Sequence, residues 1–402
     1  MAKRMAVPSE ELKLRLVGAY DNYMVARVQR LTINKDIPTT DIYEIGNNTL
    51  AGTVSDIPAV TLTFSLFDVG IRAYSVLTGT NPAAYPPTGV DISELGEVDA
   101  IIYVKDASLT DYVKSAHAKK LQVRDFSYSF SVDGEATEDY TLIGSESRWF
   151  KNDVVVDRFA YAAPGTVSWT ASAVPLVLAN GNNALTVILN DEYLTTEVVG
   201  APAAAGEYRF TTPAKVLTTF TALTVGHSVT VIYHATDGGT TWSYISETDV
   251  PAAIRGQSVK IEIKTINIPR VQNVTINGNL NTQAVKEMGN KAIVGYQRQV
   301  PAVDGTLAVL DTDTELIDLL LNGSISSGDT EFEIGIECVA SGVDLEVLIY
   351  DPCDDTSLLK TIYIPELVLT GDSYASTVNQ NATHTFNWKS NTAECIVYSG
   401  SK

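Results

Sequence analysis

Residues 27–60 read RVQRLTINKDIPTTDIYEIGNNTLAGTVSDIPAV, and residues 270–303 read RVQNVTINGNLNTQAVKEMGNKAIVGYQRQVPAV. The two stretches align without a gap at an offset of 243 residues, and 14 of the 34 aligned positions are identical. The identities include an Arg-Val-Gln triplet, a Glu-x-Gly-Asn motif and a Pro-Ala-Val triplet. Convergent strand composition gives similar hydrophobicity but not shared triplets in one register, so we interpret the pattern as a duplication.

The likeness continues beyond these stretches with a small change of offset. Ser127-Tyr128 matches Ser373-Tyr374 at an offset of 246, as expected where loops differ in length. The sequence therefore predicts one fold twice, in residues 1–160 and 253–402. The segment between them, 161–252, is then an additional domain.

Short runs of β-branched and alternating apolar residues predict a mainly β chain. Val60–Phe64 and Leu345–Tyr350 are two such runs, and turn signals such as Asn322-Gly323 lie between them. Few segments have a helical pattern. In the segment nearest the C-terminus, Thr314 could cap the start and Gly323 could end the helix. The predicted helices are Ser9–Leu16, Asp68–Leu77, Thr110–Lys119 and Thr314–Leu321.

The middle segment has a composition of its own. From about Ala163 to Val250, Ala, Thr and Val predominate, Lys and Arg are scarce, and short strand patterns alternate with Gly and Pro. This rhythm predicts a small immunoglobulin-like β-sandwich. Its expected strands are 184–189, 208–212, 228–233 and 241–245.

Each repeat also contains a long segment before its Pro-Ala-Val strand. These segments are residues 35–56 and 278–299, of 22 residues each, and they mix apolar and polar residues without a strand pattern. Loops longer than about 12 to 15 residues are usually functional or disordered. We expect ordered arms that pack on a partner, with Ile42, Ile45 and Leu50 matched by Val285, Met288 and Ile293 as contact residues.

Charge and cysteine usage exclude several classes of protein. The chain of 402 residues has 48 acidic and 28 basic residues, a net charge of −20, which disfavours binding nucleic acid through its phosphates. Three cysteines without CxxC spacing argue against a disulfide framework. The charged start and the absence of a run of about 18 apolar residues predict a soluble chain that is not exported and has no membrane contact.

Enzymatic motifs are also missing. The four histidines, His117, His227, His234 and His384, form no HExxH motif, and the sequence has no GxGxxG, P-loop or GxSxG motif. The acidic stretch 351–355 has no ordered set of oxygen-ligand spacings, and we interpret it as a hairpin turn. We therefore predict no enzyme activity, no catalytic residue, no cofactor and no metal.

The order of elements resembles the tail tube proteins of long-tailed bacteriophages. The likeness rests on the first strand, the long loop with Glu-x-Gly-Asn, the strand that opens with residues 57–60, the following helix, and the stretches 125–134 and 138–144. Some proteins of this family carry two tube domains in one chain, so the duplication strengthens the resemblance.

The resemblance implies two tandem tail-tube domains, each a barrel-forming β-sandwich with a flanking helix, plus the small immunoglobulin-like sandwich. Six such domains close around a lumen, so three chains of this kind would form one ring, and stacked rings would form the conduit for genome DNA. The long loops would reach the neighbouring ring. The implied stacking residues are Asp41, Ile42, Tyr43, Glu44, Ile45, Asn47, Leu50, Val285, Glu287, Met288, Asn290 and Ile293.

The resemblance also implies partners and a location. The chain would bind itself, hold a tape measure protein in the lumen during assembly, and contact tail terminator and tail tip or baseplate proteins. Double-stranded DNA would pass without specific binding. The protein would be assembled in the host cytoplasm and reside in the virion tail. Two alternatives stay open: a baseplate or surface-binding β-module protein, and the inner tube of a contractile injection system.

Overall fold

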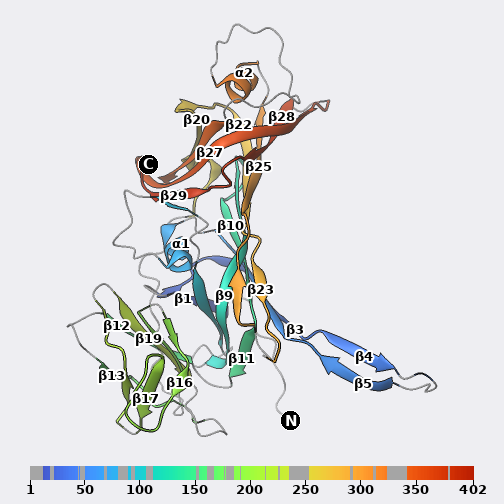
Figure 1. Ribbon diagram of the computed structural model, residues 1–402. Coiled ribbons are helices and arrows are strands. Elements are labelled where there is room, and N and C mark those ends of the chain that lie inside the picture. The colour runs from blue at the N-terminus through green and yellow to red at the C-terminus, as the bar shows by residue number, and fades with distance from the viewer. Residues whose placement is uncertain are drawn as a thin grey trace.

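The structure is a computed structural model, and its chain is mainly β, as the sequence predicts (Figure 1). Nearly all strand pairs are antiparallel. The described residues are 12–18, 22–43, 45, 50–67, 70–79, 89–91, 96–105, 112–150, 154–160, 167–175, 177, 185–190, 192–212, 214–224, 227–234, 253–289, 293–310, 314–323, 342–378 and 381–402.

The first unit is a sheet with the strand order β2–β1–β8–β9–β10–β6–β3, and β11 also pairs with β9. A hairpin of β4 and β5 extends from it, and β7 lies apart. The bounds are β1 Leu12–Val17, β2 Asn22–Met24, β3 Val28–Asp36, β4 Thr39–Tyr43, β5 Leu50–Ser55, β6 Ala59–Leu66, α1 Ile71–Thr78, β7 Val90–Asp91, β8 Glu97–Lys105, β9 Tyr112–Ser131, β10 Thr137–Gly144 and β11 Glu146–Phe150.

The second unit repeats this order strand for strand, as β21–β20–β26–β27–β28–β25–β22 with β29 on β27. A short 3-10 turn, Gly256–Ser258, precedes it. The bounds are β20 Val259–Ile263, β21 Ile266–Asn267, β22 Val271–Asn279, β23 Gln283–Val285, β24 Gly295–Gln297, β25 Ala302–Leu310, α2 Glu315–Asn322, β26 Val343–Asp351, β27 Asp354–Ala375, β28 Thr383–Ser390 and β29 Ile396–Ser399.

The repeated Arg-Val-Gln triplet has a structural reason. Arg27 and Arg270 both have a positive φ, 53° and 62°, and in both units the register of the following strand shifts by one residue. The Gln29 side chain donates to the Arg27 carbonyl at 3.1 Å, and Gln272 donates to the Arg270 carbonyl at 3.2 Å. The triplet therefore encodes a β-bulge whose carbonyl is bonded by the glutamine.

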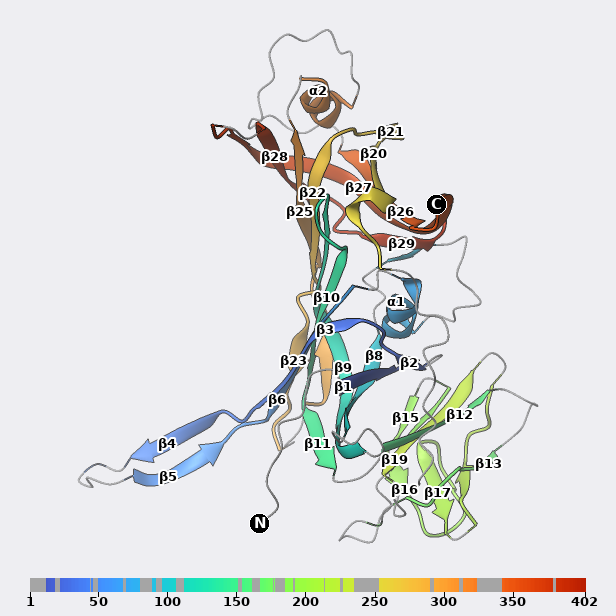
Figure 2. The same cartoon turned by 180° about the vertical axis from the view of Figure 1, so that it is seen from behind.

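The two units join edge to edge. The C-terminal half of β9 pairs antiparallel with β22, from Ser131 opposite Asn273 to Asp125 opposite Asn279. A second, short contact pairs β7 with β29. One sheet therefore continues from the first unit into the second, and the two views show it as the long axis of the molecule (Figures 1 and 2).

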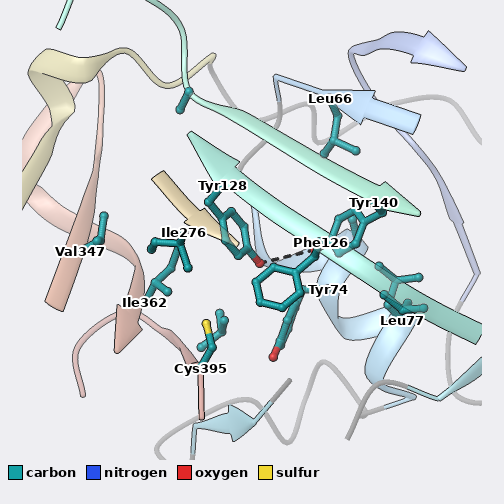
Figure 3. Close-up of a cluster of buried hydrophobic side chains, with 14 of the residues drawn as sticks. Leu66, Tyr74, Leu77, Phe126, Tyr128, Tyr140, Ile276, Val347, Ile362 and Cys395 are labelled. Atoms are coloured by element: carbon teal, nitrogen blue, oxygen red, sulfur yellow. Dashed lines mark hydrogen bonds between the residues drawn. The ribbon is translucent and has the colours of Figure 1, made fainter. Parts of the chain in front are cut away.

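A single hydrophobic core spans this junction. Tyr128 and Tyr140 of the first unit are buried together with Ile276, Ile362 and Cys395 of the second (Figure 3). Strands β6 and β10 alternate between buried and partly exposed residues, so one sheet face supplies this core and the other does not. The junction is thus part of the fold and not a flexible link between two bodies.

The middle segment, together with strand β12 from the end of the expected first domain 1–160, forms two four-stranded sheets, β12–β19–β14–β15 and β13–β18–β17–β16. Trp169, Val187, Phe210 and Val231 are among the residues of the core that they share. The expected strand at 241–245 lies outside the described residues. The bounds are β12 Val154–Ala160, β13 Ser168–Thr170, β14 Leu185–Leu189, β15 Glu192–Leu194, β16 Thr196–Glu197, β17 Glu207–Thr211, β18 Val216–Thr219 and β19 Ser228–His234.

This pair of sheets packs on the first unit. Ile101 and Tyr103 of β8 form a buried cluster with Val154 and Ile232. The Tyr193 hydroxyl donates to Asp99 at 2.8 Å. The contact therefore combines apolar burial with a partly buried hydrogen bond.

Two of the predicted helices are wrong. The expected helix Ser9–Leu16 overlaps strand β1, residues 12–17, which lies between β2 and β8. Residues 9–11 lie outside the described residues. Residues 112–119 of the expected helix Thr110–Lys119 form the start of strand β9, which pairs with β8 and β11, and residues 110–111 lie outside the described residues. In both places pairing with other strands of the sheet overrides a local helical preference.

The other two helices are confirmed, as α1 and α2. Gly79 and Gly323 both follow their helix in the left-handed conformation, which a residue without a Cβ adopts readily. Thr314 stands at the start of α2 but its side chain makes no capping hydrogen bond, so that prediction is wrong.

Candidate assembly surfaces

The β4–β5 hairpin projects from the body of the molecule as an arm (Figure 2). Every residue of β4 is exposed, and so are the large apolar side chains of both strands. Tyr43 is 72% exposed, and Ile42, Leu50 and Val54 are each close to half exposed. The sequence did not predict strands here, because alternation of one polar and one apolar face is absent from an arm that is exposed on both sides.

The arm carries most of the sequence-predicted stacking residues of the first repeat. Asp41, Ile42 and Tyr43 lie on β4, Leu50 lies on β5, and Ile45 lies between the strands. The Thr53 hydroxyl donates to the Asp41 carboxylate across the hairpin at 3.1 Å. Glu44 and Asn47 lie outside the described residues.

The second long loop forms a shorter hairpin, β23–β24, which lies beside the first unit. The Thr282 hydroxyl donates to the Val123 carbonyl at 3.2 Å, and Leu280 N–H donates to the Arg124 carbonyl at 2.8 Å. Partial burial, with the Glu97 carboxylate nearby, raises the pKa of Tyr296 to about 12. The base of this loop is therefore docked on the neighbouring unit within the same chain.

The predicted stacking residues of this second loop are in a different setting from those of the arm. Val285 ends β23, and Glu287 and Met288 follow it as exposed residues. Ile293 is half-buried. Asn290 lies outside the described residues. The two loops, which the sequence pairs, are thus one exposed arm and one hairpin that is docked at its base.

The uncovered face of the continuous sheet has mostly short polar side chains. Ser127 donates to Asn277 at 2.9 Å, and Asn277 donates to Asp304 at 3.2 Å, so the polar row crosses the junction between the units. The Ser, Thr, Asn and Asp residues of this face include Thr32, Asn34, Thr61, Thr63, Ser65, Asp125, Ser127, Ser129, Asp139, Thr141, Asn273, Thr275, Asn277, Asp304, Thr306, Thr385 and Asn387.

The polar face is acidic where the units meet. A shallow groove of 320 Å³ lies over the junction, and Asp125, Asp139 and Asp304 are among its lining residues. Arg30 of β3 and Lys389 of β28 lie in the same cross-strand row as Asp139 and Asp304, one on either side of these carboxylates. A phosphate backbone would meet carboxylates at the centre of this face, so the face disfavours tight binding of nucleic acid.

A buried ion pair connects the two units beneath this face. Lys360 of β27 and Glu138 of β10 are both fully buried, with Nζ and Oε2 3.6 Å apart. The Lys360 ammonium also lies 4.7 Å from the ring centroid of Tyr128, and the Tyr140 hydroxyl donates to Glu138. Burial, together with the Glu138 charge, raises the pKa of Tyr128 and Tyr140 well above the ordinary value.

Sequence reasoning missed this pair. Its only signal is Lys360 between Leu359 and Thr361-Ile362, a cation in a strand that otherwise reads as core. An apolar environment makes an unpaired charge costly, so the lysine implied a buried acid elsewhere in the chain.

Three of the histidines considered as candidate catalytic or metal-binding residues contact a carboxylate or an aromatic ring. His117 contacts Asp99 at 2.8 Å, His234 stacks on Phe150, and His384 contacts Asp372 at 2.7 Å. Residues 351–354 form the turn between β26 and β27, as predicted. In the described part of the chain, no group of three or more His, Cys, Asp or Glu side chains is placed to hold a metal ion. No helix among the described residues has the length and apolar character to cross a membrane.

No protein-family model and no curated protein matches the sequence. Several solved structures are similar in part, including the following three. The tube-terminating cap of the anti-feeding prophage is 12% identical, with 40% of this chain and 100% of that chain covered and a TM-score of 0.29. A chain of the sheath–tube complex of an extracellular contractile injection system is 18% identical, with 40% and 99% covered and a TM-score of 0.27. A chain of a native gene transfer agent virion is 15% identical, with 35% and 97% covered and a TM-score of 0.23.

Proposed function

We propose that the protein is a structural component of a virion tail that assembles with copies of itself into stacked rings and so forms a tail tube. The observation that carries this proposal is the β4–β5 arm. It extends from the body and exposes Ile42, Tyr43, Leu50 and Val54 to solvent. A two-stranded hairpin alone is marginally stable in water, so an arm of this kind requires a partner surface.

The energy available from the arm is large enough to drive assembly. Full burial of one large apolar side chain contributes about 1.5 to 3 kcal/mol, and the arm exposes several of them in each chain. A ring presents one arm per chain, so the contributions of the arms add at every ring-to-ring interface. We infer that the arm contacts the neighbouring ring.

The continuous polar face is the proposed lumen wall. It joins both units without a break, and its Ser, Thr, Asn and Asp side chains offer no cluster of cations to a polyanion. The opposite face supplies the core and cannot face a water-filled channel. DNA would then pass along the polar face without specific binding.

Two equivalent units in one chain supply six ring positions from three chains, and we propose this composition. The middle pair of sheets, proposed as an immunoglobulin-like domain, packs on β8 away from the polar face and would decorate the outside of the tube. A tape measure protein in the lumen, a terminator and a tip or baseplate protein are the further partners that the resemblance to tail tube proteins suggests. Assembly in the host cytoplasm is part of the same proposal.

Electron microscopy of the purified protein tests the proposal. The wild-type chain should form tubes, and a chain without residues 41–52 should stay folded but form none. The matched control is Val199→Ser with Phe220→Ser, which removes exposed apolar side chains from the middle segment and should leave tubes intact. Tubes from the deletion variant would refute the role of the arm. A folded wild-type protein that never forms tubes would favour a surface-binding role instead.

A further inference from the structure

We infer that neighbouring chains join through β3 of one chain and the C-terminal half of β27 of the next, in the register that β22 and β9 use within the chain. In this register Lys35 lies opposite Asp372, Asn34 opposite Ser373 and Ile33 opposite Tyr374. The partner is therefore a second copy of this chain. The inference rests on the proposed function, because the proposed rings form through contacts between copies of the chain.

The equivalence of the two units fixes the register. β3 and β22 correspond at an offset of 243, because Val28 pairs with Leu66 as Val271 pairs with Val309. β9 and β27 correspond at an offset of 246, because Ser129 pairs with Thr137 as Ala375 pairs with Thr383.

The observed junction then translates residue by residue. Gly278 lies opposite Phe126, Asn277 opposite Ser127, and Ile276 opposite Tyr128. Subtracting 243 from the β22 residue numbers gives their counterparts on β3, and adding 246 to the β9 residue numbers gives their counterparts on β27. The result is the three pairs named above.

Both edges that this contact needs are open in the described part of the chain. There β3 pairs with β6 alone, whereas β22 has β25 on one side and β9 on the other. Beyond Leu367, β27 pairs with β28 alone, whereas the matching half of β9 lies between β10 and β22. An open strand edge is a template for pairing with another chain.

Burial at equivalent positions shows what each edge lacks. Ile276 is fully buried at the junction, whereas its counterpart Ile33 is half-buried. Tyr128 is 0% exposed, whereas its counterpart Tyr374 is 58% exposed. The repeats therefore keep two apolar side chains of the junction, Ile33 and Tyr374, at edges where the described part of the chain covers them only in part.

The side chains at these edges also complement one another. At the junction Gly278 leaves room for the Phe126 ring, which occupies the space that a Cβ at position 278 would need. At the outer edges the counterparts are Lys35 and Asp372, so a pair of opposite charges replaces a glycine and an aromatic ring. The polar pair is retained, because Ser127 donates to Asn277 and the counterparts are Ser373 and Asn34.

Present contacts of these side chains are compatible with the pairing. Lys35 Nζ donates to the Ser147 carbonyl at 3.2 Å, and the lysine remains exposed. Asp372 uses Oδ2 for His384 at 2.7 Å, and its second oxygen accepts further bonds. The two edges differ, so each chain offers one of each kind, and head-to-tail contacts of this type build closed rings or open filaments.

Cysteine cross-linking in the full-length chain tests the register. The background is Cys338→Ser with Cys353→Ser. Asn34→Cys with Ser373→Cys, and separately Lys35→Cys with Asp372→Cys, place cysteines at adjacent facing pairs. Such pairs alternate between hydrogen-bonded and non-hydrogen-bonded, and the latter have Cα atoms about 4.5 Å apart, within disulfide range. At least one double variant should therefore form disulfide-linked multimers on oxidation.

The control is Ile33→Cys with Asp372→Cys, which is two residues out of register. Diagonal neighbours lie about 7 to 8 Å apart, beyond disulfide range, so no multimers should form. The inference would be overturned if the control formed multimers at the same rate as the matched variants. It would also be overturned if neither matched variant formed multimers while circular dichroism showed both to be folded. Tubes without matched cross-links would support the proposed function and refute the inferred register. Cross-linked rings that form no tubes would support the register and refute the proposed function.

Charge reversal gives an independent readout. Lys35→Asp or Asp372→Lys alone opposes like charges and should weaken ring formation by up to about fivefold. The double variant Lys35→Asp with Asp372→Lys should restore ring formation. Failure of the double variant to improve on either single variant would overturn the proposed pairing.

Discussion

Replacing Lys360 with methionine should strongly destabilise the folded chain. The lysine is fully buried, and its ammonium lies 3.6 Å from the Glu138 carboxylate and 4.7 Å from the centroid of the Tyr128 ring. Methionine fills similar space but leaves the buried carboxylate without its cation. Breaking one partner of such a pair costs about 3 to 5 kcal/mol, a large part of the stability of most domains.

Urea unfolding, followed by circular dichroism, measures this loss. Glu138→Gln should cost a similar amount, and the double variant should cost much less than the sum of the two, because no unpaired charge remains. Lys114 is the matched control: it lies at the counterpart of Lys360 in the first unit, is exposed, and stands 4.9 Å from the Trp149 ring. Lys114→Met should cost about 1 kcal/mol or less.

Equal unfolding free energies for Lys360→Met and the wild type would refute this reasoning. Strictly additive losses in the double variant would refute it as well, because they would show that Lys360 and Glu138 are not coupled. The interaction between the two charges would then contribute nothing to the contact between the units.

Acid and thiol chemistry give further predictions. Burial alone would raise the pKa of Asp99, but hydrogen bonds from His117, Lys120 N–H and Tyr193 outweigh it and the pKa is lowered. A lowered pKa contributes stability above the ordinary value of about 3.9 that is lost as the pH falls through the folded-state pKa, so Asp99→Asn should show a flatter dependence of unfolding free energy on pH below about 4. Identical acid profiles would contradict this. Burial raises the pKa of Cys395 to about 12, whereas Cys353 is exposed. In a Cys338→Ser background, a thiol reagent should therefore modify Cys353 in the native chain and Cys395 only after unfolding, and rapid modification of both would show that the junction core opens.

The repeat was predictable from the sequence because local structure fixed its most similar residues. Arg27 and Arg270 hold the same left-handed bulge, and each is followed by the glutamine that bonds its carbonyl. Gly323 was predictable for a similar reason, since a helix ends there in a conformation that favours glycine. Features of this kind depend on a few neighbouring residues.

Features that depend on distant partners were not predictable. The segment expected as a helix at 110–119 has Ala and Lys in a helical pattern, yet β8 and β11 hold residues 112–119 as the start of a 20-residue strand. The difference between the two long loops also escaped prediction, because it arises where the second unit meets the first, through contacts such as Thr282 with Val123. The open edges of β3 and β27 become visible only when the junction register is known.

A three-dimensional reconstruction of the assembled tube would test the central claim most directly. The account predicts rings of three chains, β3 of each chain beside the C-terminal half of β27 of the next, and the β4–β5 arm on the adjacent ring. The polar face with Ser127 and Asn277 should line the lumen. Rings of six chains, or a tube in which these two edges stay apart, would contradict the account.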